Sequence, residues 1–223
     1  MRTVEYAPGR SVDLYGDPSD PTVLLWHGMQ TDSRAALRPL AEAIASHRLA
    51  VVVPDWNSHA DDGGRSDLLG SAAFARDSAT NADDLVVVGW SMGGLAAAGL
   101  TIQSNAVGMR VGHTVCLAGA FGATDPISGG SLLDGLDGGP TGSFTLLHGL
   151  HDDVVPITVS TTFAAKLGEF GWPAEVVELD ADHGSIAGAR YDATHDRYEP
   201  SDDPSTLGVA ADVAARIALA AGR

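Results

Sequence analysis

The sequence predicts an α/β fold built on a mostly parallel sheet with helices on both faces. Short apolar segments rich in β-branched residues recur along the chain, and longer segments with helical spacing lie between them. The apolar positions within the short segments are nearly continuous rather than alternating. Such strands are typical of a parallel sheet that is covered on both faces.

Six short segments have the length and composition of buried strands. In chain order they are Thr22–His27, Leu49–Pro54, Leu85–Trp90, His113–Ala118, Ser143–His148 and Ala174–Leu179. Two N-terminal pieces, Thr3–Ala7 and Val12–Tyr15, predict an antiparallel hairpin at one edge of the sheet.

The longer segments predict helices, and two further stretches are irregular. Residues 119–142 are rich in Gly, Asp and Pro, and they are too few for an inserted helical cap domain. Residues 190–205 are polar and contain prolines, which predicts a surface loop before the last helix. We expect substrate contacts from such loops, because ligands of open α/β sheets lie at the carboxyl ends of the strands. The expected helices are Ser33–His47, Ser66–Thr80, Met92–Gln103, Thr158–Phe170 and Thr206–Ala220.

Length and composition favour one domain spanning residues 1–223, since single cores stop growing near 250–300 residues. The opening segment MRTVEYAPGR lacks the apolar stretch of a secretion signal. No apolar run approaches the roughly 18 residues of a membrane helix. Cys116 is the only cysteine, so neither an intrachain disulfide nor a cysteine-based metal cluster can form. We therefore expect a cytoplasmic protein, either a monomer or a homodimer.

The chain is strongly acidic, with 29 Asp and Glu against 13 Lys and Arg and a net charge of −16. Such a surface repels phosphate backbones, so nucleic acid is not an expected partner. The carboxylates are spread along the chain, which fits a salt-adapted soluble surface better than an acidic binding face.

The segment GWSMG, residues 89–93, matches G-x-S-x-G between a predicted strand and a predicted helix. In that setting the serine occupies a strained bend, and the glycines let strand and helix approach closely. Its hydroxyl would then lie at a helix N-terminus, where developing negative charge is favoured. The alternative is a tight turn that happens to contain serine. The setting favours Ser91 as a nucleophile.

A serine nucleophile needs a base, and the base needs an orienting acid. Asp152 lies just after the strand Ser143–His148, and His183 lies just after Ala174–Leu179. Either loop alone is read as a polar turn. Together they supply acid and base in the chain order that follows the nucleophile in this fold class.

An oxyanion hole completes such a site, and backbone N–H groups commonly form it. We expect one donor from the N–H of Met92, which follows the serine, and the other from Met29 in the turn after the first long strand. Gln30 is the fallback for the second donor. His27 is expected to brace this turn.

These segments give the chain a resemblance to serine hydrolases of the α/β-hydrolase fold, above all to small, lidless carboxylesterases and lipase-like esterases. The resemblance implies Ser91 as nucleophile, Asp152 as acid and His183 as base, without a cofactor. The chain departs from many esterases in having HGMQ in place of HGGG, so we do not carry over the substrates of that subfamily. The matching stretches, in the family's order, are VDLYGDPSDPTVLLWHGM, VVVPDW, VVVGWSMGG, LLHGLHDDVVP and DHGS.

Several neighbouring residues compete for the acid and base roles. Asp152 is preferred to Asp153 because it fits the family spacing Gly-x-x-Asp-x-x-Val-Pro. Asp125 is an alternative acid after another strand. His195 can serve as base only if its loop folds over the site, and a solvated histidine is the better interpretation. His148 is expected to brace the acid turn.

Other chemistries find less support in the sequence. The His and Asp residues in 59–62 and 151–153 could ligate a cation, but neither group has the spacing of a metal site, so no metal is expected. No strand-linked G-x-G-x-x-G is present, so no dinucleotide is expected. Trp90 is either core or a wall of the acyl pocket, and we favour the wall.

The sequence therefore predicts cleavage of small carboxylic esters through an acyl-enzyme. A thioesterase or an amide or formamide hydrolase would share every motif named above. A non-catalytic binding protein on this fold would have lost or buried a member of the triad, whereas all three residues are present.

Overall fold

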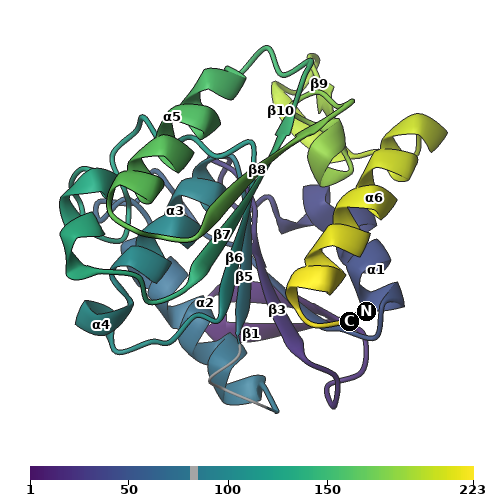
Figure 1. The fold of residues 1–223 in the computed structure, drawn as a ribbon. Helices are drawn as coiled ribbons and strands as arrows, with labels where there is room; N and C mark the ends of the chain where they lie inside the picture. The colour runs from purple at the N-terminus through teal and green to yellow at the C-terminus, as the bar shows by residue number, and fades with distance from the viewer. Residues whose placement is uncertain (81–84) are drawn as a thin grey trace.

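The structure is a computed structural model that describes residues 1–80 and 85–223. Within these ranges, eight strands form one sheet in the order β1-β2-β4-β3-β5-β6-β7-β8 (Figure 1). The strands from β3 onward run parallel, whereas β2 pairs antiparallel with both β1 and β4. The mostly parallel sheet and its N-terminal hairpin are thus confirmed. The strands are β1 (Arg2–Ala7), β2 (Arg10–Tyr15), β3 (Thr22–Trp26), β4 (Ala50–Pro54), β5 (Val86–Trp90), β6 (His113–Leu117), β7 (Ser143–Gly149) and β8 (Ala174–Leu179).

Helices cover both faces of the sheet (Figure 1). On one face lie α1 (Arg38–Ser46) and α6 (Pro204–Ala220), which contact each other. On the other face lie α2 (Arg65–Ser78), α3 (Met92–Ile102) and α5 (Ile157–Glu169). The shorter helical turns are η1 (Arg34–Leu37), α4 (Ser104–Val107), η2 (Leu132–Gly138) and η3 (Ser185–Ala187).

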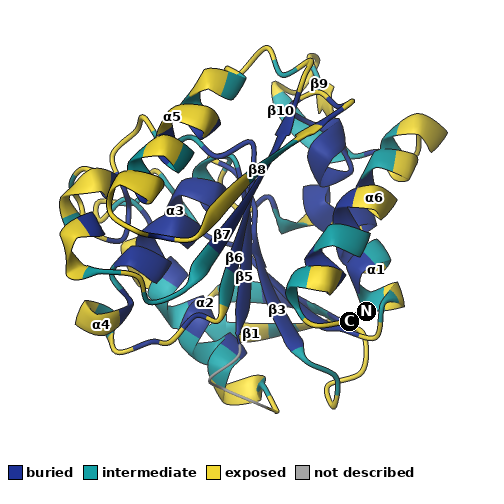
Figure 2. Ribbon diagram, in the orientation of Figure 1, coloured by how far each residue is buried: buried dark blue, intermediate teal, exposed yellow. Residues whose placement is uncertain are grey.

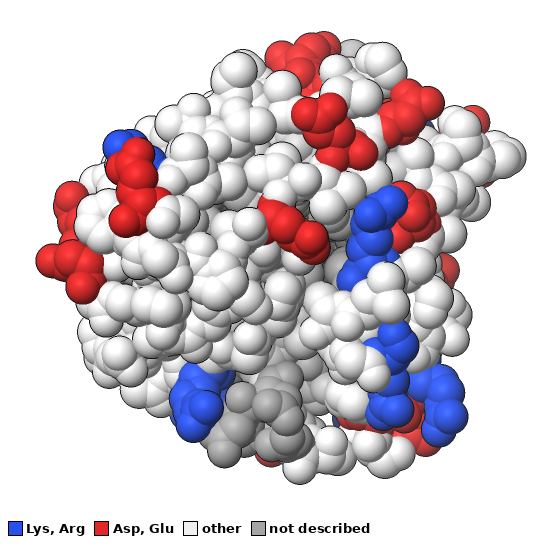
Figure 3. All heavy atoms as spheres, viewed as in Figure 1, with Lys and Arg blue, Asp and Glu red and all other residues white. Residues whose placement is uncertain are grey.

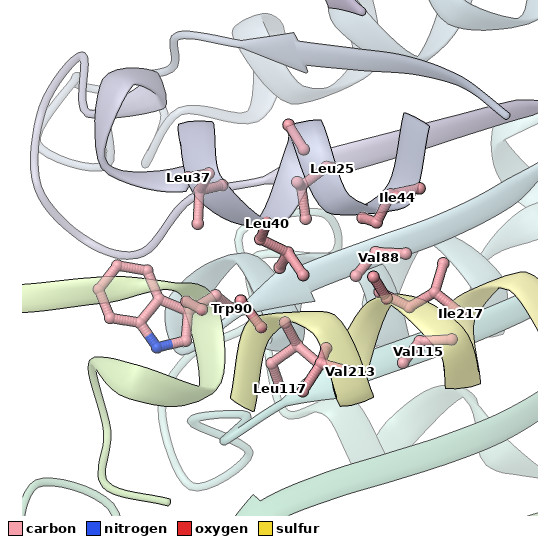
Figure 4. Close-up of a cluster of buried hydrophobic side chains, with 14 of the residues drawn as sticks. Leu25, Leu37, Leu40, Ile44, Val88, Trp90, Val115, Leu117, Val213 and Ile217 are labelled. Atoms are coloured by element: carbon pink, nitrogen blue, oxygen red, sulfur yellow. The ribbon is translucent and has the colours of Figure 1, made fainter. Parts of the chain in front are cut away.

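Successive strand residues serve the two faces in turn, because side chains alternate along a strand. Leu25 joins the cluster beneath α1 and α6, whereas its neighbour Leu24 joins the cluster beneath α2 and α3. Figure 4 shows the first cluster, in which Leu40 and Ile217 from the two helices meet strand residues such as Val115. Both faces of the central strands are therefore buried, as Figure 2 shows by its colours.

The predicted helix Ser33–His47 is wrong as a single element, because the structure divides it into η1 and α1. Pro39 lies in the first turn of α1. Proline has no N–H to donate to a preceding turn, and its ring clashes with the carbonyl four residues earlier, so it favours a new helix start.

The predicted surface loop 190–205 is wrong in its first half, where the chain forms a second, two-stranded sheet. Strands β9 (Ala189–Asp192) and β10 (Arg197–Pro200) pair antiparallel as a hairpin. Their sequences ARYD and RYEP are short and polar, so they carry no strand pattern of their own. Contacts with distant parts of the chain, described below, hold the hairpin in place.

The spread of surface charge agrees with the even distribution of carboxylates along the sequence. Asp and Glu are scattered over the face shown in Figure 3 rather than gathered into one patch. Among the helices of the described ranges, none is both long and apolar enough to cross a membrane.

Candidate active site

Ser91 lies at a sharp bend between β5 and α3, with φ of 56° and ψ of −117°. A residue with a side chain rarely adopts this conformation, which costs about 1–3 kcal/mol and persists only where the surrounding structure enforces it. Strain of this kind is concentrated at functional sites. The bend is the strained elbow that the sequence predicts.

Glycines on either side make the elbow possible. A Cβ on Gly89 would lie 2.0 Å from the carbonyl oxygen of Gly93, and a Cβ on Gly93 would lie 2.4 Å from that of His27. Real Cβ atoms do not approach so closely, so both positions require glycine. The predicted close packing of strand and helix is confirmed, and it extends from β5 to the end of β3.

Asp152 and His183 meet at the same edge of the sheet. The Nδ1 atom of His183 lies 2.8 Å from Oδ2 of Asp152, and the two side chains are 3% and 0% exposed. Asp152 follows β7 and His183 follows β8, as expected for residues just beyond neighbouring parallel strands.

The Asp152 carboxylate is held in its charged form. Burial raises its pKa, but the hydrogen bond from His183 and those from the backbone N–H groups of Val155 and Val154 outweigh burial, so the pKa lies below its ordinary value. A charged carboxylate next to Nδ1 favours the tautomer with the proton on that nitrogen and leaves Nε2 free to accept one.

His148 supports the turn that carries Asp152, as expected. The side chain of His148 is buried, and its Nδ1 lies 2.8 Å from Oγ of Ser160 while its Nε2 lies 2.8 Å from the carbonyl oxygen of Val155. These contacts tie the turn that carries Asp152 to the first half of α5.

Trp90 links the elbow to the histidine loop. Its Nε1–H donates to the carbonyl oxygen of His183 at 2.8 Å, and its ring lies 5.4 Å from the imidazole, centroid to centroid. In the described part of the chain no hydrogen bond joins the Ser91 hydroxyl to His183; such bonds are often long before substrate binds. Trp90 is buried in the cluster under α1 and α6 (Figure 4), so the prediction that it forms a wall of the acyl pocket is wrong.

The turn after β3 and the start of α3 each offer a free backbone donor at the elbow. Within the described residues, neither the N–H of Met29 nor that of Met92 donates to another protein atom. The Oγ–H of Ser58 donates to the carbonyl oxygen of Met29 at 2.5 Å, which fixes the peptide that follows it. Ser58 was not singled out in the sequence, because nothing local marks it.

His27 holds this turn through a neutral ring. Its Nε2 accepts hydrogen bonds from the N–H groups of Ser33 and Trp56 at 3.3 and 3.2 Å, so the ring proton lies on Nδ1, which donates to the carbonyl oxygen of Gly28. Complete burial lowers the pKa of His27 to about 3. The expected bracing role is confirmed.

Gln30 ties the same turn to the hairpin β9–β10. Its Oε1 accepts from the backbone N–H of Tyr198 at 2.8 Å, and its Nε2–H donates to the carbonyl oxygen of Asp196 at 3.3 Å. The Tyr198 ring in turn packs edge-on against Trp90 and lies 5.9 Å from the imidazole of His183, centroid to centroid. The hairpin therefore connects the turn after β3 with the histidine loop, a link the sequence did not reveal.

The competing residues lie elsewhere or are engaged. Asp153 is exposed, whereas Asp125 is buried and accepts from the N–H groups of its own loop. His195 is exposed in the hairpin turn and contacts Asp192 at 2.8 Å. Of these candidates, only Asp152 contacts His183.

Comparison with known proteins identifies the fold. No family model and no curated protein matches the sequence. Among solved structures, the propionate-bound esterase Est2 of Thermogutta terrifontis superposes with a TM-score of 0.71 at 16% identity, over 97% of this chain and 94% of that one. Esterase B from Lactobacillus rhamnosis gives a TM-score of 0.74 at 14% identity, over 100% and 87%. The chain has the α/β-hydrolase fold, without a cap domain in its described part.

The neutral, buried His27 predicts a loss of stability in acid. The imidazole of His27 takes up a proton near the ordinary pKa of 6.5 in the unfolded chain, but only near 3 in the folded chain. The contribution of His27 to stability is therefore fully present above pH 6.5 and is lost as the pH falls below that value. We expect the free energy of unfolding to drop by about 1.4 kcal/mol for each pH unit through this window from His27 alone. Urea unfolding of wild type and His27→Asn between about pH 7 and about pH 5 measures this, and the variant should have the flatter profile.

The exposed His195→Gln variant is the control, and its profile should match that of wild type. Equal slopes for wild type and His27→Asn would mean that His27 is not held neutral in the folded protein.

Proposed function

We propose that the protein is a serine hydrolase that cleaves small carboxylic esters through an acyl-enzyme. The observation that carries the proposal is the strained elbow of Ser91 at the same sheet edge as the buried Asp152–His183 pair. A serine at its ordinary pKa is a weak nucleophile, and such a pair supplies the base that activates it.

In the first half-reaction, Ser91 Oγ attacks the acyl carbon and its proton passes to Nε2 of His183. Asp152 keeps the imidazole in place and balances the charge that the ring acquires. The N–H groups of Met29 and Met92 donate to the oxyanion, and one such donor commonly contributes about 3 kcal/mol. The tetrahedral intermediate then collapses, His183 returns the proton to the departing alcohol, and the acyl group stays on Ser91.

In the second half-reaction, water takes the place of the alcohol. His183 accepts a proton from the water as its oxygen attacks the acyl carbon, and the same oxyanion donors stabilise the second intermediate. The proton then passes to Ser91 Oγ, and the carboxylic acid leaves. These steps use only the groups of the chain and water.

The structural neighbours support an ester substrate. The Thermogutta terrifontis esterase has been solved with propionate and with butyrate bound, and also phosphorylated by paraoxon. The first two ligands are short carboxylates, which favours short acyl groups for this chain by analogy of fold. Thioesters and amides need the same machinery, so a substrate panel decides between them and esters.

Replacing the nucleophile should abolish activity. We expect Ser91→Ala to lower hydrolysis of p-nitrophenyl acetate by at least about a thousandfold and to prevent labelling by a fluorophosphonate. Ser46→Ala, on the exposed side of α1, is the control and should behave as wild type. Equal turnover by Ser91→Ala and wild type would refute the proposal, as would a wild type that neither reacts nor labels.

Two adjacent carboxylates offer a matched test of the acid. Asp152→Asn should lower kcat by at least about a hundredfold, because an amide at this position favours the wrong imidazole tautomer. Asp153→Asn removes a neighbouring exposed charge and should stay within about twofold of wild type. Steady-state kinetics on p-nitrophenyl acetate measures both, and the reverse ranking would assign the acid to Asp153.

The contacts of Gln30 predict a positioning role for this side chain. Gln30→Ala removes both hydrogen bonds to the hairpin and frees the turn that carries the Met29 N–H, so kcat should fall about tenfold with KM little changed. Fluorophosphonate labelling should slow in parallel, because it uses the same donors. Gln103→Ala, at the far end of α3, is the matched control. A change confined to thermal stability would mean that Gln30 acts only in folding.

A further inference from the structure

A pocket of about 590 Å³ lies between helix α5 and the loop that follows β6, and this loop contacts the backbone of the proposed nucleophile. Phe121 lines it from the loop, and the preceding residue, Ala120, donates its N–H to the carbonyl oxygen of Ser91 at 3.1 Å. Thr158, in the first turn of α5, lines the opposite wall just after the turn that carries Asp152. The loop thus connects one wall of the pocket to the elbow, and the pocket extends along α5.

The lining is apolar and hydroxyl-bearing with one charge. Phe121 and Phe163 stack at 4.2 Å between ring centroids, and Leu133 and Val159 add further apolar surface. The only charged residue that lines the pocket is Lys166, which is also the only lysine of the chain. In a protein with 29 carboxylates and 13 basic residues, this pocket is lined by one cation and by no carboxylate.

Lys166 forms an exposed ion pair with Glu169 that another carboxylate can replace. Its side chain is 42% exposed and pairs with Glu169, 57% exposed, at 2.8 Å from Nζ to Oε2. Exposed ion pairs three residues apart on a helix contribute little free energy. A carboxylate that arrives through the pocket therefore competes with Glu169 at small cost.

The length of the pocket limits the ligand. Lys166 follows Thr158 by eight positions on α5, which is about 12 Å at 1.5 Å per residue. An extended chain spans this distance with roughly ten atoms. We propose that the pocket binds one arm of the ester, a medium-length apolar chain whose terminal carboxylate pairs with Lys166. This inference rests on the proposed esterase function and narrows its substrates to esters that carry such an anionic arm.

Kinetics on matched esters tests the proposal. Monomethyl sebacate carries the carboxylate on its acyl arm, the acetate ester of ω-hydroxydecanoic acid carries it on its alcohol arm, and methyl decanoate is the neutral reference. Lys166→Met should lower the ratio of kcat/KM for one anionic ester to that for methyl decanoate by about fivefold, mainly through KM. The ester that responds identifies the arm.

Two further variants separate charge from shape. Lys166→Arg keeps the charge and should retain most of the ratio, whereas Glu169→Gln removes the competing carboxylate and should raise it about twofold. High salt should weaken each effect, because the site is partly exposed. An unchanged ratio in Lys166→Met would overturn the proposal.

Binding without turnover distinguishes failure of the pocket from failure of the proposed function. Sebacate titrated into Ser91→Ala by calorimetry should bind, and it should bind about fivefold more weakly when Lys166→Met is added. Lys166-dependent binding in a wild type that cleaves no ester would refute the esterase but keep the pocket. Hydrolysis of p-nitrophenyl acetate that depends on Ser91, without Lys166-dependent sebacate binding, would refute only the anionic arm.

Discussion

The site depends on how closely the start of α3 approaches the end of β3. Gly93 leaves room for the carbonyl oxygen of His27 where any Cβ would collide with it. This approach forces the bend at Ser91 and brings the turn carrying Met29 beside it. A substitution for Gly93 would therefore disturb the proposed nucleophile and its proposed oxyanion donor together, although it touches neither side chain.

Electrostatics divides the buried polar groups into two kinds. His27 is neutral because it is desolvated and its Nε2 accepts two backbone hydrogen bonds, and it serves as an uncharged brace. Asp152 is charged because hydrogen bonds from His183 and two backbone N–H groups outweigh its burial. Burial thus keeps His27 neutral, whereas hydrogen bonds keep Asp152 charged.

The sequence predicts the sheet and the residues of the candidate site because both are marked locally. Buried parallel strands are continuous apolar runs, and Asp152 and His183 stand directly after two of them. The hairpin β9–β10 could not be predicted in this way. Its strands are polar, and its partner Gln30 lies 168 residues from Tyr198 in the chain. Trp90 has two interpretations in the sequence, core or pocket wall, because its position at the elbow does not determine which way the ring turns.

The hairpin has a consequence for the charge around His183. Desolvation, together with the nearby carboxylates of Asp152, Asp153 and Asp182, raises the pKa of Tyr198 to about 12. The phenol is therefore neutral wherever the protein is folded near neutral pH, and Asp152 is the carboxylate in direct contact with the imidazole. A neutral ring excludes water from one side of His183 without adding a second negative charge. Such a charge would stabilise the protonated imidazole before substrate arrives, and a ring that is already protonated cannot accept the proton of Ser91 in the proposed mechanism.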